Sequence, residues 1–181
     1  MKKLITGLAL VCSTLLPINS FSQNSSEKQQ NKDKGIFGIS VAEFNDKTSR
    51  EEVPIVPGLV FGYNREIAKD FYASLTTSLH YEAYEKNDYK VFISDLTPSL
   101  RWKPSTIFVG LGAVYRNLTS TYKETGDKTK YSGLGWTINF GIESKENSRG
   151  NSFFLESSYD QVKTDDDENM GVAKLTAGIR F

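Results

Sequence analysis

Apolar and polar side chains alternate with a period of two along this chain, and the pattern recurs from residue 35 to residue 181. A half-buried strand has this period, whereas an amphipathic helix repeats every 3.6 residues. The segment GVAKLTAGIRF, residues 171–181, is typical, because Ile179 and Phe181 share one face while Arg180 lies on the other. No convincing helical stripe interrupts the pattern. The chain is therefore predicted to be an all-β protein.

Eight alternating segments can be delimited, which predicts eight strands in one antiparallel up-and-down barrel. The last segment is expected to pair with the first and close the barrel. Pro57 and Pro98 count against two of the strands, because proline lacks the amide that a strand ladder uses. The predicted strands are about residues 35–44, 53–64, 70–84, 89–102, 106–118, 132–143, 152–163 and 171–181.

The first 22 residues have the features of a secretory signal peptide: a basic start, an apolar stretch at residues 4–16 and a small-residue cleavage site. The apolar stretch is shorter than the ~20 residues that a transmembrane helix needs. It contains the only cysteine, Cys12, so the mature chain is expected to have no disulfide. Residues 23–34 contain no apolar residue and are predicted to be a disordered periplasmic leader. This leaves residues 35–181 as the barrel domain.

Composition narrows the class of protein. The chain has 22 basic and 22 acidic residues, so its charge does not suggest a nucleic-acid partner. Its mean hydropathy of −0.41 is low for a helical membrane protein. It is compatible with a membrane barrel, because only alternate residues of each strand meet lipid.

Alternation also fits a soluble ligand-binding barrel, in which the apolar face points inward. The connections between segments favour a membrane barrel, which has short turns on the periplasmic side and longer loops outside. The predicted connection at residues 85–88 is shorter than this scheme prefers. The short turns are expected at 65–69, 103–105 and 144–151, and the long charged loops at 45–52, 119–130 and 164–169.

Aromatic residues of the apolar face sort toward the two ends of the strands, as they do at membrane interfaces. The expected periplasmic girdle is Tyr63, Phe71, Trp102, Phe153 and Phe181, and the expected external girdle is Tyr81, Phe92, Tyr115, Trp136 and Tyr159.

The other face carries small residues and charges of both signs, and no charge lies in the middle of an apolar face. Eight strands enclose a space that side chains fill, so the charges are expected to pair within a closed lumen. The inward charges are Glu82, Asp95, Arg101, Arg116, Glu143, Glu156, Asp160, Lys174 and Arg180.

Three sequences carry a family resemblance: LTAGIRF at 175–181, LTPSLRWKP at 96–104 and FVGLGAVYR at 108–116. With them, residues 35–181 resemble the small outer-membrane β-barrel domains of OmpA and OmpX type. The resemblance implies a monomer in the outer membrane of a Gram-negative bacterium, in contact with lipid and lipopolysaccharide. It also implies that the barrel-assembly machinery reads the last strand. The resemblance covers the barrel alone, without the cell-wall-binding domain of the larger family members, so cell-wall tethering is not expected.

Some small outer-membrane barrels modify lipid A, so an enzymatic role is one alternative. The only histidine, His80, shares the inward face with Ser78 and Glu82, so a Ser, His, Glu grouping is available. It faces the lumen rather than the lipid, where such a substrate lies. We therefore interpret His80 as a hydrogen-bonded interior residue and predict no catalytic residue.

Three further kinds of motif are weaker candidates for a binding or modification site. The acidic run at residues 165–168 suits a hard divalent cation, but a solvated loop explains it as well. The glycosylation patterns at residues 24–26 and 117–119 carry little weight in a bacterium, and Gly133 to Gly135 lacks the helix and lysine of a phosphate loop. We predict no cofactor and no metal site.

The sequence thus predicts a non-enzymatic outer-membrane barrel with an envelope structural or surface-interaction role. The loop at residues 119–130 is its best candidate for an external contact surface, and the extracellular partner is unknown. A narrow channel for ions or very small solutes is the alternative, followed by a lipid-modifying enzyme or a soluble ligand-binding barrel.

Overall fold

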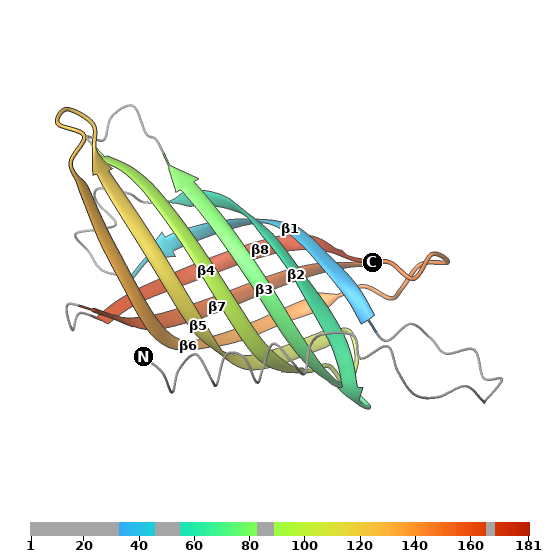
Figure 1. Ribbon diagram of the computed structural model, residues 1–181. Coiled ribbons are helices and arrows are strands. Elements are labelled where there is room, and N and C mark those ends of the chain that lie inside the picture. Colours follow the sequence, from blue (N-terminus) through green and yellow to red (C-terminus); the bar gives the residue numbers. More distant parts are fainter. Residues whose placement is uncertain (1–32, 46–54, 83–88, 166–168) are drawn as a thin grey trace, which may run out of the picture.

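The protein forms one closed barrel of antiparallel strands (Figure 1). The computed structural model describes residues 33–45, 55–82, 89–165 and 169–181. Each strand pairs with its neighbours in chain order, and Ile36 opposite Arg180 belongs to the ladder that closes the barrel. This confirms the predicted eight-stranded up-and-down fold. The strands are β1 (Asp33–Phe44), β2 (Val56–Ala68), β3 (Phe71–Glu82), β4 (Tyr89–Trp102), β5 (Ile107–Tyr122), β6 (Lys128–Glu143), β7 (Ser152–Thr164) and β8 (Asn169–Arg180).

The predicted signal peptide lies outside the described residues, as does the leader up to residue 32. The prediction that residues 33–34 are disordered was wrong, because both belong to β1. Asp33 is opposite Arg65 in the ladder, and its carboxylate lies 3.5 Å from the Arg65 guanidinium. This ion pair helps to hold the polar start of β1 against β2. Within the described ranges, no helix is long and apolar enough to cross a membrane.

The prediction of a long loop at residues 119–130 was wrong, because β5 and β6 continue through most of this segment. Ladder pairs extend to Thr121 opposite Lys128, and only residues 123–127 form the turn. Gly126 has a φ of 76°, and its amide donates to the Tyr122 carbonyl at 2.9 Å. The connection at residues 144–151, which we expected to be among the compact ones, is longer than this turn.

We call the end of the barrel that carries the β5–β6 turn the hairpin end. The end where β1 begins and β8 finishes is called the terminus end. The two ends lie at opposite extremes of the barrel axis, and the β6–β7 turn lies with the terminus end (Figure 1).

Burial is inverted relative to a soluble barrel. Ile39, on the outer face of β1, is 63% exposed, whereas Arg116, on the inner face of β5, is 2% exposed. The same alternation of exposed apolar and buried residues runs along β5 and β6. An exterior of this kind suits lipid and would be unfavourable in water. The soluble ligand-binding barrel is therefore inconsistent with the structure.

Both prolines are accommodated in strands. Pro57 is exposed and is opposite Val41 of β1. Pro98 is opposite Leu75 of β3, but the β4–β5 ladder omits it between Leu96 and Ser99. The ladder is thus interrupted where the proline amide is missing, and β4 still spans the predicted residues.

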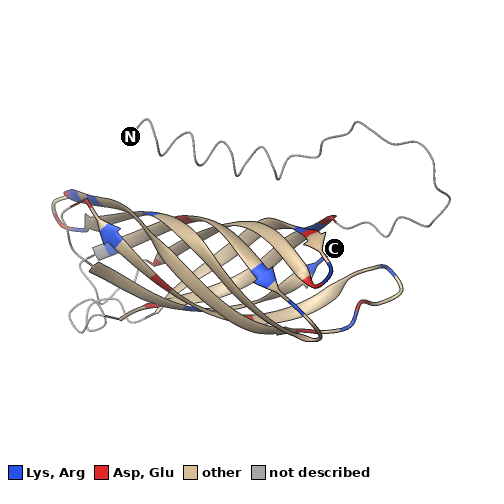
Figure 2. Ribbon diagram, turned by 90° about the horizontal axis from the view of Figure 1, so that it is seen from below, with Lys and Arg blue, Asp and Glu red and all other residues tan. Residues whose placement is uncertain are grey.

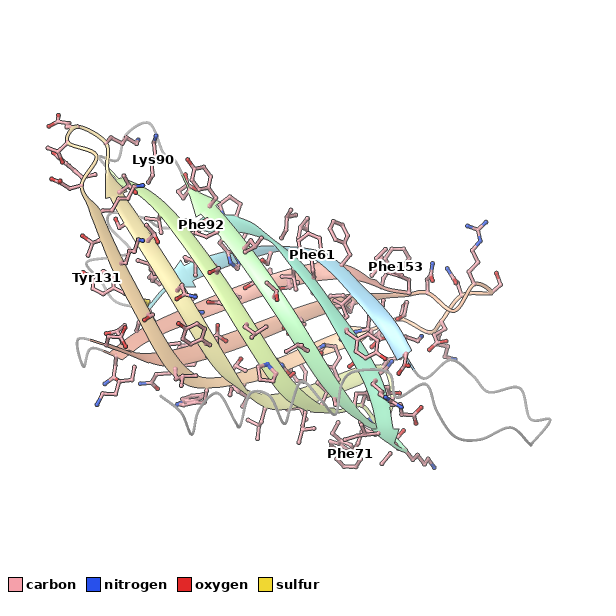
Figure 3. All side chains as sticks on the ribbon, in the orientation of Figure 1. Phe61, Phe71, Lys90, Phe92, Tyr131 and Phe153 are labelled. Carbon is pink, nitrogen blue, oxygen red and sulfur yellow. The ribbon has the colours of Figure 1, made fainter. Side chains whose placement is uncertain are left out.

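Aromatic side chains lie outward toward both ends of the barrel. Phe71 and Phe153 lie at the terminus end and Phe92 lies toward the hairpin end (Figure 3). In the ladders, Phe71 is opposite Trp102 and Tyr81 is opposite Phe92. These positions agree with the expected girdles.

Candidate functional site

A charge network fills the centre of the lumen. Asp95 accepts two hydrogen bonds from the Arg116 guanidinium, at 2.8 and 2.9 Å, and Arg116 also binds Asp160 at 2.6 Å. The Lys174 ammonium lies 2.6 Å from a carboxylate oxygen of both aspartates. Two cations and two anions therefore balance in a buried site. Charged residues of both signs occur along the barrel wall as well as on its turns (Figure 2).

A second charge network lies at the terminus end. Glu143 of β6 contacts Arg180 of β8 and lies 2.9 Å from the Lys103 ammonium. Arg101 of β4 lies 2.9 Å from a carboxylate oxygen of Glu156 on β7. Every charge in the two networks except Lys103 was predicted to face inward, and the structure shows which ones pair. Pairing compensates the cost of burying each ion.

An apolar cluster packs inside the barrel at the hairpin end, and sequence analysis did not predict it. The sequence contains a signal for this cluster, because valine, isoleucine and phenylalanine occupy inward positions near these strand ends. The cluster contains Ala42, Phe44, Val56, Val91, Ile93, Leu118 and Val172, with Tyr131 and Met170 packed against it. We call it the outer plug.

Three further apolar residues, Ile36, Phe108 and Phe154, form a cluster inside the terminus end. The Arg180 guanidinium lies 4.9 Å from the Phe108 ring centroid and 4.8 Å from that of Phe154. Arg101 also lies over Phe108, at 5.4 Å. We call this cluster the inner plug. It joins the terminus-end charge network to apolar packing through cation–π contacts.

Between the plugs the free space is small. A cavity of about 30 Å³ is lined by residues that include Thr76, Arg101, Asn139 and Lys174. This volume holds about one water molecule. The Asn139 side-chain oxygen is buried without a protein partner, which makes it a natural hydrogen-bonding site for such a water.

A larger space of about 680 Å³ opens at the terminus end. Its lining is polar and charged and includes Asn64, Tyr72 and Arg149. Lys34 also lines it, and its ammonium donates to the Gly150 carbonyl at 2.9 Å and contacts Glu146. The β6–β7 turn is thereby fixed to β1. We call this space the vestibule.

The structure separates Ser78, His80 and Glu82, which we considered as a catalytic grouping and did not predict to be one. The His80 Nε2 is bonded to the Ser40 hydroxyl at 2.7 Å, whereas Ser78 donates to Asp95 at 3.3 Å. Glu82 lies at the end of β3, opposite Val91. His80 is fully buried in the lumen, as predicted, and its grouping with Ser78 and Glu82 does not form a nucleophile and base pair.

The acidic run and the glycine pair lie at least partly in the described residues, where their contacts explain them. The glycosylation pattern at residues 24–26 lies outside the described residues. Asp165 accepts a hydrogen bond from Ser132, whereas residues 166–168 and 24–26 are not described. Among described residues, no group of three His, Cys, Asp or Glu side chains is placed to hold a metal. Gly133 and Gly135 lie in β6, where an added Cβ would meet the β7 backbone at 2.2 and 1.8 Å. They allow close strand packing.

Several solved structures share this architecture. Neisserial surface protein A is 13% identical, with a TM-score of 0.57 over 82% of this chain and 96% of that chain. The fold is that of the small outer-membrane barrels. Ail of Yersinia pestis is 18% identical, with a TM-score of 0.53 over 82% of this chain and 97% of its own.

The N-terminal barrel domain of Pseudomonas aeruginosa OprF is 14% identical, with a TM-score of 0.51 over 83% of this chain and 98% of its own. No protein-family model and no curated protein sequence matches the chain. The likeness is thus one of fold, and function has to be argued from the barrel's own residues.

Proposed function

We propose that this protein is a non-enzymatic, monomeric barrel of the bacterial outer membrane, which presents its hairpin end to the outside as a structural or surface-interaction element. The inverted burial is the observation that carries the proposal, because an apolar exterior around a charged interior needs lipid on the outside. The fold shared with outer-membrane proteins supports the same location.

The closed lumen supports a scaffold rather than a channel. The outer plug, the central charge network and the inner plug follow one another along the barrel, and the cavity between the plugs holds about 30 Å³. A hydrated ion needs a continuous water-filled path, and eight strands leave room for little besides side chains. The packing of the described residues therefore favours a closed scaffold over a channel.

Assembly is proposed to follow the route implied by the family resemblance, with a signal peptide at residues 1–22 and recognition of β8 by the barrel-assembly machinery. The closing position of β8 against β1 supports this role for the last strand.

Two measurements test the proposal. The protein should be recovered with the outer membrane and migrate faster on gels before heating than after it, because a folded barrel resists detergent. In planar bilayers it should give no discrete conductance. Recovery in the periplasmic fraction would reject the location, and stable single-channel steps would reject the closed scaffold.

A further test addresses enzymatic activity. Replacement of His80 by Ala should leave the acylation pattern of lipid A unchanged in mass spectra of cells that express the protein. A change that depends on His80 would show that the lumen takes part in lipid modification.

A further inference from the structure

The wall of the vestibule contains two charges without an ion pair, and the chain enters the barrel beside them. We propose that residues 23–32, which we call the N-terminal segment, bind across the mouth of the vestibule, with Lys32 on Glu66 and Glu27 on Arg149. The inference goes beyond the proposed function and rests on it in one respect, the removal of residues 1–22. It assigns an occupant to the largest space at the terminus end of the described barrel.

The vestibule can hold a short stretch of polypeptide. Its volume of about 680 Å³ lies within the range of roughly 300–1,000 Å³ that is typical of ligand pockets. Glu143 lines it and contacts Arg180, whose guanidinium lies over both aromatic rings of the inner plug. The wall of the vestibule is thus joined to the inner plug, and an occupant enters from the terminus end.

Ion pairs neutralise most of the charges in the vestibule wall. The pairs are Lys34 with Glu146, Lys103 with Glu143 and Asp33 with Arg65. Among the described residues that line the space, two charged side chains, Glu66 and Arg149, have no ion pair. An occupant that carries one charge of each sign would therefore complete the wall.

The register of β1 and β2 brings the N-terminal segment to Glu66. Asp33, the first residue of β1, is opposite Arg65 of β2. One step further in the same register, Lys32 falls opposite Glu66, which belongs to β2 and lines the vestibule. Opposite charges at facing positions of adjacent strands attract each other. The first contact thus requires only that an existing ladder continue by one residue.

The segment is long enough to reach Arg149 in the β6–β7 turn. Eight strands that are about 4.8 Å apart and tilted by about 40° enclose a barrel roughly 16 Å in diameter. The chain from Lys32 to Glu27 can extend over roughly 17 Å, so it can cross the whole mouth. The turn is also held to β1, because the Lys34 ammonium donates to the Gly150 carbonyl at 2.9 Å. Glu27 can therefore meet Arg149, the neighbour of Gly150.

The composition of the N-terminal segment suits a polar cavity. Its sequence, QNSSEKQQNK, contains amide, hydroxyl and charged side chains and no apolar residue. Asn64, in the vestibule wall, is buried, and its side-chain oxygen has no partner in the protein. Such a group is normally satisfied by water or by an occupant, and amide side chains supply both donors and acceptors. A sequence too polar to fold alone can be ordered by a complementary surface in this way.

Attachment to the barrel favours this segment over a free peptide. An exposed ion pair strengthens binding by no more than about fivefold, so two such pairs would hold a separate peptide weakly. The N-terminal segment is joined directly to Asp33, which lines the vestibule. A short flexible connection of this kind gives an effective concentration on the order of millimolar.

The test uses cysteine pairs in residues 23–181, which contain no cysteine of their own. The chain is folded in phosphatidylcholine vesicles, and each variant is first checked for heat-modifiable migration. Ser26→Cys with Ser148→Cys connects the segment to the vestibule wall. The matched control, Ser26→Cys with Ser105→Cys, connects it to the β4–β5 turn at the same end, outside the vestibule lining. The first pair should form a disulfide within one chain on the order of tenfold faster than the second.

Charge variants test the Lys32–Glu66 pair. In the Ser26→Cys, Ser148→Cys background, Glu66→Gln should slow the cross-link by up to about fivefold, and Lys32→Glu combined with Glu66→Lys should restore the rate. Glu124→Gln, at the hairpin end, removes the same charge and should leave the rate unchanged.

The outcomes separate the inference from the proposed function. Equal rates for the two cysteine pairs would overturn the inference, as would the absence of a disulfide in both. A disulfide between two chains would overturn it in favour of a second copy's segment. A chain that gives no heat-modifiable barrel in lipid would refute the proposed function instead.

Discussion

Arg116 and Asp160 meet across the lumen, with 2.6 Å between the Arg116 Nη2 and the Asp160 Oδ2, although β6 separates their strands in the barrel wall. Lys174 of β8 contacts the same carboxylate, so one side chain of β7 joins strands on both sides of it. The interior thus contributes cross-links that the backbone ladders cannot provide. Their stability depends on the balance of charge in the site.

Replacement of Asp160 by Asn should destabilise the barrel by about 3–5 kcal/mol, because it leaves two buried cations with one carboxylate. Urea unfolding in phosphatidylcholine vesicles measures this, and the fluorescence of the lipid-facing Trp102 and Trp136 reports the transition. Glu124→Gln, in the exposed turn, is the charge-matched control and should change stability by less than about 0.5 kcal/mol. A loss below about 1 kcal/mol for Asp160→Asn would contradict a balanced network.

A double replacement tests charge balance directly. Asp160→Leu together with Lys174→Met removes one charge of each sign and leaves Arg116 with Asp95. Well-packed apolar residues can replace a buried ion pair at little cost, so the double variant should be more stable than Asp160→Asn. If both are equally unstable, geometry rather than charge determines the stability of the lumen.

Truncation of Phe108 to Ala should cost about 3–5 kcal/mol, since it leaves a cavity in the inner plug. The ring is buried and also lies against the guanidinium groups of Arg101 and Arg180. Phe140→Ala, on the lipid-facing side of β6, removes the same atoms where lipid can fill the space, and should cost less. Equal losses for the two variants in urea unfolding would argue against a packed plug.

Much of the architecture could be predicted from the sequence, because the face of the barrel on which a side chain lies follows from its position in the strand. β4 was predicted with its observed bounds, and the pairing of the last strand with the first was confirmed. The strand extensions beyond Leu118 and before Ser132 were missed because the residues there are polar or charged on both faces, so the alternation that marks a half-buried strand is absent.

The partners inside the lumen could not be predicted in the same way. Asp95, Arg116, Asp160 and Lys174 were each assigned to the inner face, but which charges meet depends on ladder register and on distances across the barrel. The outer plug was missed for a different reason. The inner face was interpreted as polar throughout, although inward Val91, Ile93 and Leu118 carry an apolar signal at one end.

Replacement of Gly135 by Ala should destabilise the barrel by about 1–3 kcal/mol, because the backbone must move to admit the new atom. The added Cβ would lie 1.8 Å from the Gln161 carbonyl oxygen of β7. Thr129→Ala, near the exposed start of the same strand, serves as the control and should have a small effect. The measurement is the temperature at which the folded, faster-migrating form disappears from gels. If the Gly135→Ala barrel is as stable as the wild type, β6 and β7 can move apart at this position without a loss of stability.

A depth series on the outer face of β5 tests whether the apolar exterior lies in lipid. Leu111 is 63% exposed in the middle of the strand, and Asn117 lies on the same face toward the hairpin end. In a bilayer, Leu111→Arg should cost about 2–4 kcal/mol, whereas Asn117→Arg should cost about 0–1 kcal/mol, because the penalty for a cation falls toward the interface. Urea unfolding in phosphatidylcholine vesicles gives both values. In water the two exposed positions would be nearly equivalent, so equal effects in vesicles would place the barrel surface outside the membrane.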